Sequence, residues 1–136
     1  MLILIVDKEI RWASHVKKPL EDEGHQVEIL EDYEKITEYT GKGKIDFIFY
    51  DFNVFKKNQK FLAQLIMQNP QIRVIVTATL PNYKDAMCAK RYGAIDYIDK
   101  LYDYDELKNI MGKNLNHIPV SRAYLEQVLN EEELCL

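Results

Sequence analysis

Short strand-like runs alternate with helix-like patterns five times in the first 111 residues, and this order constrains the fold more than any other feature of the chain. The five runs cover residues 2–6, 26–30, 45–50, 73–77 and 96–98. They are too short for buried helices and are rich in β-branched and aromatic residues, as strands covered on both faces are. Strands and helices that alternate in this way form parallel sheets with right-handed crossovers. We therefore expect a doubly wound five-stranded α/β domain.

The segments between these runs carry apolar residues at helical spacing. We predict helices over residues 9–23, 33–39, 61–66 and 83–92, followed by a further helix that Asp103 or Asp105 caps. Residues 52–57 have no clean period, and we predict a loop there.

Residues 114–136 lie beyond the alternating pattern. They contain a candidate helix cap, Ser121, and an apolar stripe between Tyr124 and Leu129, which predict one extra amphipathic helix. The 136 residues suffice for one full core but not for two. We therefore divide the chain into a domain over residues 1–113 and a C-terminal segment over 114–136. Two interpretations of the extra helix stay open: it packs on its own domain, or it is a linker or dimerisation helix.

The composition excludes several classes of function. The formal net charge is −4 and no basic stripe occurs, which argues against binding to nucleic acid or anionic membranes. No apolar run approaches the ~20 residues of a membrane span, and residues 1–6 do not form a signal peptide, so we expect a cytoplasmic protein. Cys88 and Cys135 have no close spacing, and we expect free thiols. The three histidines have no ligand-like spacing that would indicate zinc.

Four polar side chains stand at the carboxyl ends of predicted strands: Asp7, Asp51, Thr77 and Lys100. These ends line the crevice in which open α/β sheets bind their ligands, so we expect the four side chains to converge. Two carboxylates, a hydroxyl and an ammonium suit phosphoryl transfer, in which a carboxylate takes up the phosphoryl group and the other groups hold its oxygens. For Asp51 taken alone, the alternative is that it only caps or solvates the end of its strand.

These strand ends resemble the receiver domain of two-component response regulators. The matching pieces are ILIVD at 3–7, DFIFYD at 46–51, VIVTA at 74–78 and GAIDYIDK at 93–100. Each piece is short, but all four occur in the order and spacing of the family. The resemblance covers roughly residues 1–111 and implies the flavodoxin-like strand order 2-1-3-4-5.

By position, the resemblance implies that Asp51 is the phospho-acceptor, Thr77 the hydroxyl that moves toward the phosphoryl group and Lys100 its charge partner. Tyr97 matches the aromatic switch residue that rotates between exposed and buried positions. The chain is then expected to accept a phosphoryl group from a histidine kinase or phosphotransfer protein in a phosphorelay. It is not expected to be an enzyme beyond its own phosphorylation.

The resemblance also implies Mg²⁺, held by Asp7, Asp51 and the backbone carbonyl of Asn53. Lys8 stands where the family has its second acid, however, and an ammonium cannot ligate a cation. We hypothesise that Lys8 pairs with Asp51 and takes the place of the metal. The competing idea is that Glu9 serves as a substitute ligand, which we favour less because its side chain should leave the strand end on another side.

Three kinds of function compete. The first is a phosphorylation-switched receiver, which Asp51, Thr77 and Lys100 favour. The second is a pseudo-receiver that binds partners without phosphate, which Lys8 favours. The third, a small α/β enzyme or flavin carrier, lacks both a glycine loop after the first strand and an Asp-x-Asp motif at the acceptor. We prefer the first.

Tyrosines gather in the fourth and fifth strand-helix units, where the family makes dimer or partner contacts. They are Tyr83, Tyr92, Tyr97, Tyr102 and Tyr104. Tyrosine is favoured at protein interfaces, which predicts a homodimer or a partner face here. The alternative is that these residues lie half-buried on an ordinary surface.

Overall fold

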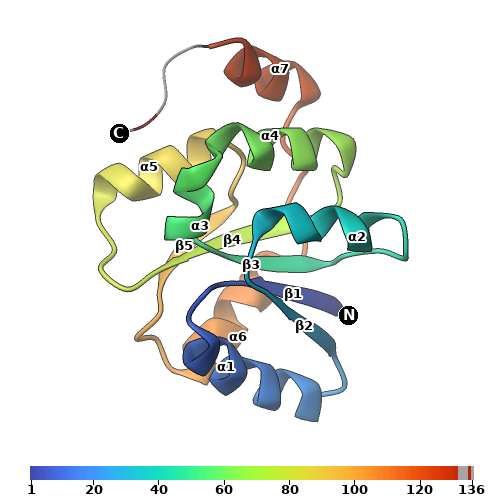
Figure 1. Ribbon diagram of the computed structural model, residues 1–136, viewed down its shortest axis with the longest axis vertical. Coiled ribbons are helices and arrows are strands. Elements are labelled where there is room, and N and C mark those ends of the chain that lie inside the picture. The colour runs from blue at the N-terminus through green and yellow to red at the C-terminus, as the bar shows by residue number, and fades with distance from the viewer. Residues whose placement is uncertain (132–134, 136) are drawn as a thin grey trace.

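The computed structural model describes residues 1–131 and Cys135 and shows one parallel sheet with helices on both faces (Figure 1). The strands are β1 (Leu2–Val6), β2 (Gln26–Leu30), β3 (Phe47–Asp51), β4 (Arg73–Ala78) and β5 (Asp96–Asp99). Their order is β2-β1-β3-β4-β5, and each neighbouring pair is parallel. The predicted five-stranded flavodoxin-like fold is confirmed.

Helices cover the two faces unequally (Figure 1). One face carries α1 (Ile10–Asp22) and α6 (Tyr104–Lys113). The other carries the 3-10 turn η1 (Tyr33–Ile36), α2 (Thr37–Thr40), α3 (Phe52–Lys57), α4 (Gln59–Gln68) and α5 (Tyr83–Arg91), with α7 (Arg122–Asn130) packed outside α4. In the described part of the chain, no helix has the length and apolar character needed to cross a bilayer.

The sheet separates two apolar cores. Ile3 and Ile5 of β1 face the core under α1 and α6, whereas Leu4 and Val6 face the core under α3, α4 and α5. Every residue of β3 is buried, because this central strand is covered on both faces. The burial of β3 explains why its sequence is a continuous apolar run rather than an alternating one, and it places the terminal residue, Asp51, inside the protein.

The loop predicted over residues 52–57 is wrong, because these residues form α3. The Asp51 carboxylate caps this helix and accepts hydrogen bonds from the backbone N–H groups of Asn53, at 3.1 Å, and Val54, at 3.3 Å. Six residues make fewer than two helical turns, so no apolar period is visible in the sequence. The cap and the buried aromatic rings of the segment hold the helix instead.

The prediction of free thiols is also wrong. Cys88 of α5 and Cys135 form a disulfide, with Cα atoms 5.7 Å apart. Their sequence separation of 47 hid the pairing, since the chain returns over α4 through α7 before it reaches Cys135. Leu125 and Val128 of α7 are buried in the same core as residues of α4 and α5, so the extra helix packs on its own domain. The division at residue 113 stays a prediction.

The tyrosines of the fourth and fifth units do not share one environment. Tyr92 is fully buried, with its ring 5.9 Å from that of Phe55, so it cannot belong to a surface. Tyr83 is 79% exposed and Tyr102 is also exposed. Tyr104 is partly buried, and its hydroxyl donates a hydrogen bond to Glu23.

Tyr50 supplies a prediction about stability. It is fully buried in β3, and its hydroxyl has no hydrogen-bond partner among the described residues. Burial raises the pKa of Tyr50 above its ordinary value of 10.0. Above that pH the unfolded chain loses the phenol proton and the folded chain keeps it, so stability falls by up to about 1.4 kcal/mol per pH unit.

We expect Tyr50→Phe to be neutral or stabilising by about 1 kcal/mol at neutral pH, because no hydrogen bond is lost. The variant should also lose less stability than the parent as the pH rises above 10. Urea denaturation across the alkaline range measures both effects, with exposed Tyr83→Phe as the control. Equally steep alkaline losses in the parent and in Tyr50→Phe would contradict the prediction.

Candidate functional site

The four strand-end residues lie at one edge of the sheet, as expected from the fold. Asp51 and Thr77 are register partners across β3 and β4, Asp7 directly follows β1, and Lys100 directly follows β5. All four are buried, with no more than 6% of any residue exposed. Buried ionisable groups at the carboxyl edge of a parallel sheet mark a candidate ligand or catalytic site.

The Lys100 ammonium joins the two acids. Its Nζ lies 2.6 Å from Asp7 Oδ2 and 2.9 Å from Asp51 Oδ1. Burial alone would lower the pKa of Lys100, but its hydrogen bonds to Asp7 and Asp51 outweigh burial and hold that pKa above the ordinary value. Burial raises the pKa of Asp7, against the hydrogen bond from Lys100. The two carboxylates therefore share one buried positive charge.

The hypothesis that Lys8 pairs with Asp51 is wrong, because Lys100 occupies that place. Lys8 is exposed, and no ion pair involves it in the part of the chain that the structure describes. Its side chain lies instead beside Lys57 of α3, where it lowers the pKa of Lys57 through direct contact and like charge. Sequence reasoning missed Lys57, whose approach to Lys8 depends on the unexpected helix α3.

The expectation that the Glu9 side chain leaves the strand end on another side is wrong, because this side chain lies at the site. Its Oε1 lies 3.5 Å from Lys100 Nζ and accepts a hydrogen bond from the Thr79 hydroxyl at 3.4 Å. Trp12, one turn further along, donates its indole N–H to the Lys100 carbonyl at 3.0 Å, and its ring centroid lies 5.3 Å from Nζ. Neither contact could be predicted from the sequence, because helical spacing does not show which way the side chains of Glu9 and Trp12 point after β1.

Thr77 and Tyr97 complete the set. Thr77 is fully buried, and its hydroxyl has no hydrogen-bond partner within the described residues. The Tyr97 ring packs edge-on against Phe52, with centroids 6.1 Å apart, and its hydroxyl is buried. Since Phe52 directly follows Asp51, the ring contact connects Tyr97 on β5 with the residue next to the central carboxylate.

Strand order 2-1-3-4-5, with two acids, a threonine and a lysine at its carboxyl edge, defines a flavodoxin-like domain with a buried acidic site. Residues 3–111 match the family model of the response regulator receiver domain. The chain belongs to this family. Receiver domains are signalling modules of two-component systems, and they interact with histidine kinases or phosphotransfer proteins.

Individual relatives agree with this assignment. The response regulator ArlR of Staphylococcus saprophyticus is 30% identical over 105 residues, which cover 77% of this chain and 48% of that protein. A response regulator of Thermotoga maritima has a similar fold, with a TM-score of 0.76 at 22% identity over 84% of this chain and 96% of that one. NtrX of Brucella abortus gives a TM-score of 0.74 at 26% identity, covering 84% of this chain and 26% of that one. The chain spans about half or less of the length of the curated relatives it matches.

Receiver domains typically bind Mg²⁺ at the phosphorylation site, but the residues present here do not fit that ion. One oxygen of Asp7 and one of Asp51 accept backbone N–H groups, including that of Asn53, and the other oxygen of each faces Lys100. The residue after Asp7, Lys8, stands where the family has its second acid and offers an ammonium in place of a carboxylate. No group of three or more His, Cys, Asp or Glu side chains suited to a metal occurs in the described ranges. Hard divalent cations need several free oxygen ligands.

Proposed function

We propose that this chain is a receiver in a phosphorelay and that Asp51 accepts the phosphoryl group from a histidine kinase or phosphotransfer protein. One observation carries the proposal: the buried Asp51 carboxylate has an ammonium 2.9 Å away and a Thr77 hydroxyl without a partner on the adjoining strand. A phosphoryl group on Asp51 would give Thr77 the acceptor oxygen that it lacks. Membership in the receiver family supports this assignment.

The contacts of Asp51 suit nucleophilic attack. Its Oδ2 accepts the N–H groups of Asn53 and Val54, which orients the carboxylate, while Oδ1 faces Lys100. In the proposed step an Asp51 oxygen attacks phosphorus and forms the new O–P bond. The bond from phosphorus to the donor breaks, and the leaving imidazole or carboxylate keeps its electron pair. Lys100 offsets the charge on the phosphoryl oxygens.

We propose that Tyr97 communicates the modification to a partner. If Thr77 shifts toward a phosphoryl group, the adjoining β5 and the Tyr97–Phe52 ring contact are placed to respond. Leu80, Tyr83 and Leu101 are each more than three-quarters exposed in the same fourth and fifth units, which supports a homodimer or partner face there.

Lys8→Asp tests the part of the account that concerns the metal. We expect phosphorylation of the parent by acetyl phosphate to depend little on Mg²⁺, because Lys100 already neutralises the acids. In Lys8→Asp the added carboxylate should let Mg²⁺ accelerate adduct formation by about tenfold or more, equal to about 1.4 kcal/mol. Timed intact-mass spectra with and without Mg²⁺ give the rates.

Lys18→Asp makes the same charge change at an exposed site on α1 and should leave the rate as in the parent. Saturable binding of Mg²⁺ to the parent at millimolar concentration, with a matching acceleration, would contradict the account.

The proposed function itself is tested by incubating the parent chain with acetyl phosphate and measuring its intact mass. A labile adduct of one phosphoryl group supports the receiver. An unmodified parent in both the presence and absence of Mg²⁺ would contradict it and favour a pseudo-receiver that binds partners without phosphate.

A further inference from the structure

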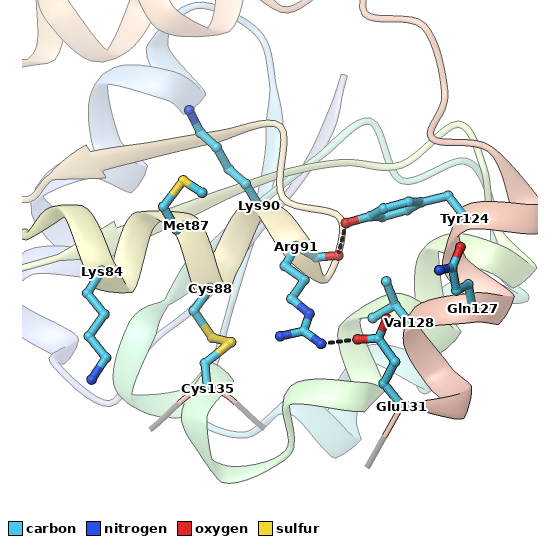
Figure 2. A pocket seen from close by; sticks show the side chains of 10 residues that line it. All are labelled: Lys84, Met87, Cys88, Lys90, Arg91, Tyr124, Gln127, Val128, Glu131 and Cys135. Carbon is cyan, nitrogen blue, oxygen red and sulfur yellow. Dashed lines mark hydrogen bonds and ion pairs between the residues drawn. A yellow bond between two sulfur atoms is a disulfide. The ribbon is translucent and has the colours of Figure 1, made fainter. Parts of the chain in front are cut away.

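The disulfide between Cys88 and Cys135 lies at the wall of a pocket between α5 and α7 (Figure 2). The pocket has a volume of about 660 Å³ and is open to solvent, and Met87 and Val128 also line it. Cys88 itself is 5% exposed. Cys135 also lines the pocket and is partly exposed, so a small thiol or disulfide in the pocket can approach the sulfur pair from the Cys135 side.

Gln59, the first residue of α4, holds the backbone of Cys135. Its amide donates to the Cys135 carbonyl at 2.8 Å, and its carbonyl accepts the Cys135 N–H at 3.1 Å. The Gln59 side chain is nearly fully buried, and Cys135 supplies a hydrogen-bond partner for both of its polar groups. The Gln59 carbonyl oxygen also lies 3.8 Å from Cys88 Sγ. The two hydrogen bonds hold the Cys135 backbone against α4, and we expect them to keep the Cys135 thiol near Cys88 after reduction.

Further polar contacts join α7 and the residue after it to α5, near the disulfide. The Tyr124 hydroxyl of α7 donates to the Arg91 carbonyl of α5 at 2.9 Å, and the Arg91 side chain pairs with Glu131 just after α7 (Figure 2). Tyr124 and Glu131 therefore both bind α5, and Cys135 binds α4 through Gln59.

We propose that Cys88 and Cys135 form a reversible redox site, and that its disulfide form latches the C-terminal segment across α4 and α5. The oxidant that fits is a small disulfide such as oxidised glutathione. One of the two thiolates attacks it and forms a mixed disulfide with release of one glutathione. The other cysteine then displaces the second glutathione, so the two thiols lose two protons and two electrons in all.

The first test equilibrates the full chain in glutathione buffers of graded ratio, quenches with acid, alkylates free thiols and measures the intact mass. We expect a single transition from a doubly alkylated chain to an unalkylated monomer. The mass of this monomer should be two hydrogens below that calculated for the unalkylated dithiol chain. Gln59→Met removes both hydrogen bonds to Cys135 and should shift the midpoint about tenfold toward easier reduction. Gln64→Met, an exposed change on the same helix, should leave it unchanged.

The second test measures amide hydrogen exchange of α5 in both redox states. We expect slower exchange over residues 83–91 in the oxidised parent and no redox difference in Cys135→Ser. Complete alkylation at every glutathione ratio would overturn the redox site, as would a disulfide formed only between two chains. Equal exchange of α5 in the oxidised and reduced parent would overturn the latch.

Discussion

Replacing Asp51 with asparagine is expected to abolish phosphoryl incorporation from acetyl phosphate and to leave the fold intact. A carboxamide is not a nucleophile toward phosphorus, so no adduct can form at this position. The amide oxygen can still accept the N–H of Asn53 and cap α3. Lys100 keeps Asp7 as its partner at 2.6 Å, so the buried ammonium stays paired. Intact mass shows the adduct, and circular dichroism shows the fold.

The matched control for this substitution is Asp32→Asn. Asp32 is an exposed acid just beyond β2, and its side chain makes no capping hydrogen bond. This variant should be phosphorylated like the parent. An adduct in Asp51→Asn with the yield of the parent would show that the phosphoryl group resides elsewhere, and the assignment of Asp51 would be wrong.

Lys100→Met is expected to destabilise the folded chain by about 3–5 kcal/mol at neutral pH, because it leaves two buried carboxylates without a counter-charge. The methionine preserves most of the side-chain volume, so loss of packing contributes little. The penalty should shrink in acid, because burial raises the pKa of Asp7 and a protonated Asp7 needs no counter-charge. Urea denaturation at neutral pH and near pH 4 measures both values.

Lys108→Met is the control for the loss of a lysine ion pair. Lys108 pairs with Glu23 at 2.7 Å, but both side chains are exposed, and exposed pairs contribute little to stability. This variant should stay close to the parent at both pH values. Equal losses of stability in Lys100→Met and Lys108→Met would contradict the view that Lys100 neutralises a buried site.

The alternation of strands and helices was predictable from the sequence because each apolar run and each helical stripe is a local pattern that the structure retains, whereas the strand order 2-1-3-4-5 was implied by the resemblance to receiver domains. The same reasoning placed Asp7, Asp51, Thr77 and Lys100 at one edge, since parallel strands bring their carboxyl ends together. The roles of these residues stay predictions that the experiments above decide. The side-chain partners were harder: Lys100 was expected to accompany a phosphoryl group, and in the structure it already bridges the two acids.

The features that sequence reasoning missed depend on contacts between distant segments or on a single cap. The helix α3 depends on the Asp51 side chain, which accepts the backbone N–H groups of Asn53 and Val54. The pairing of Cys88 with Cys135 depends on the return of the chain through α7. The sequence groups Tyr92 with the other tyrosines of a possible interface, but its position at the end of α5 directs the ring into the core.

The most direct test of the central claim maps the modified residue. The parent chain is incubated with acetyl phosphate and reduced with borohydride, which converts an aspartyl phosphate to homoserine, and the peptides are then sequenced by mass spectrometry. We expect homoserine at position 51 and at no other acid. Homoserine at position 7, or its absence from a chain that carries a phosphoryl group, would contradict the claim that Asp51 is the acceptor.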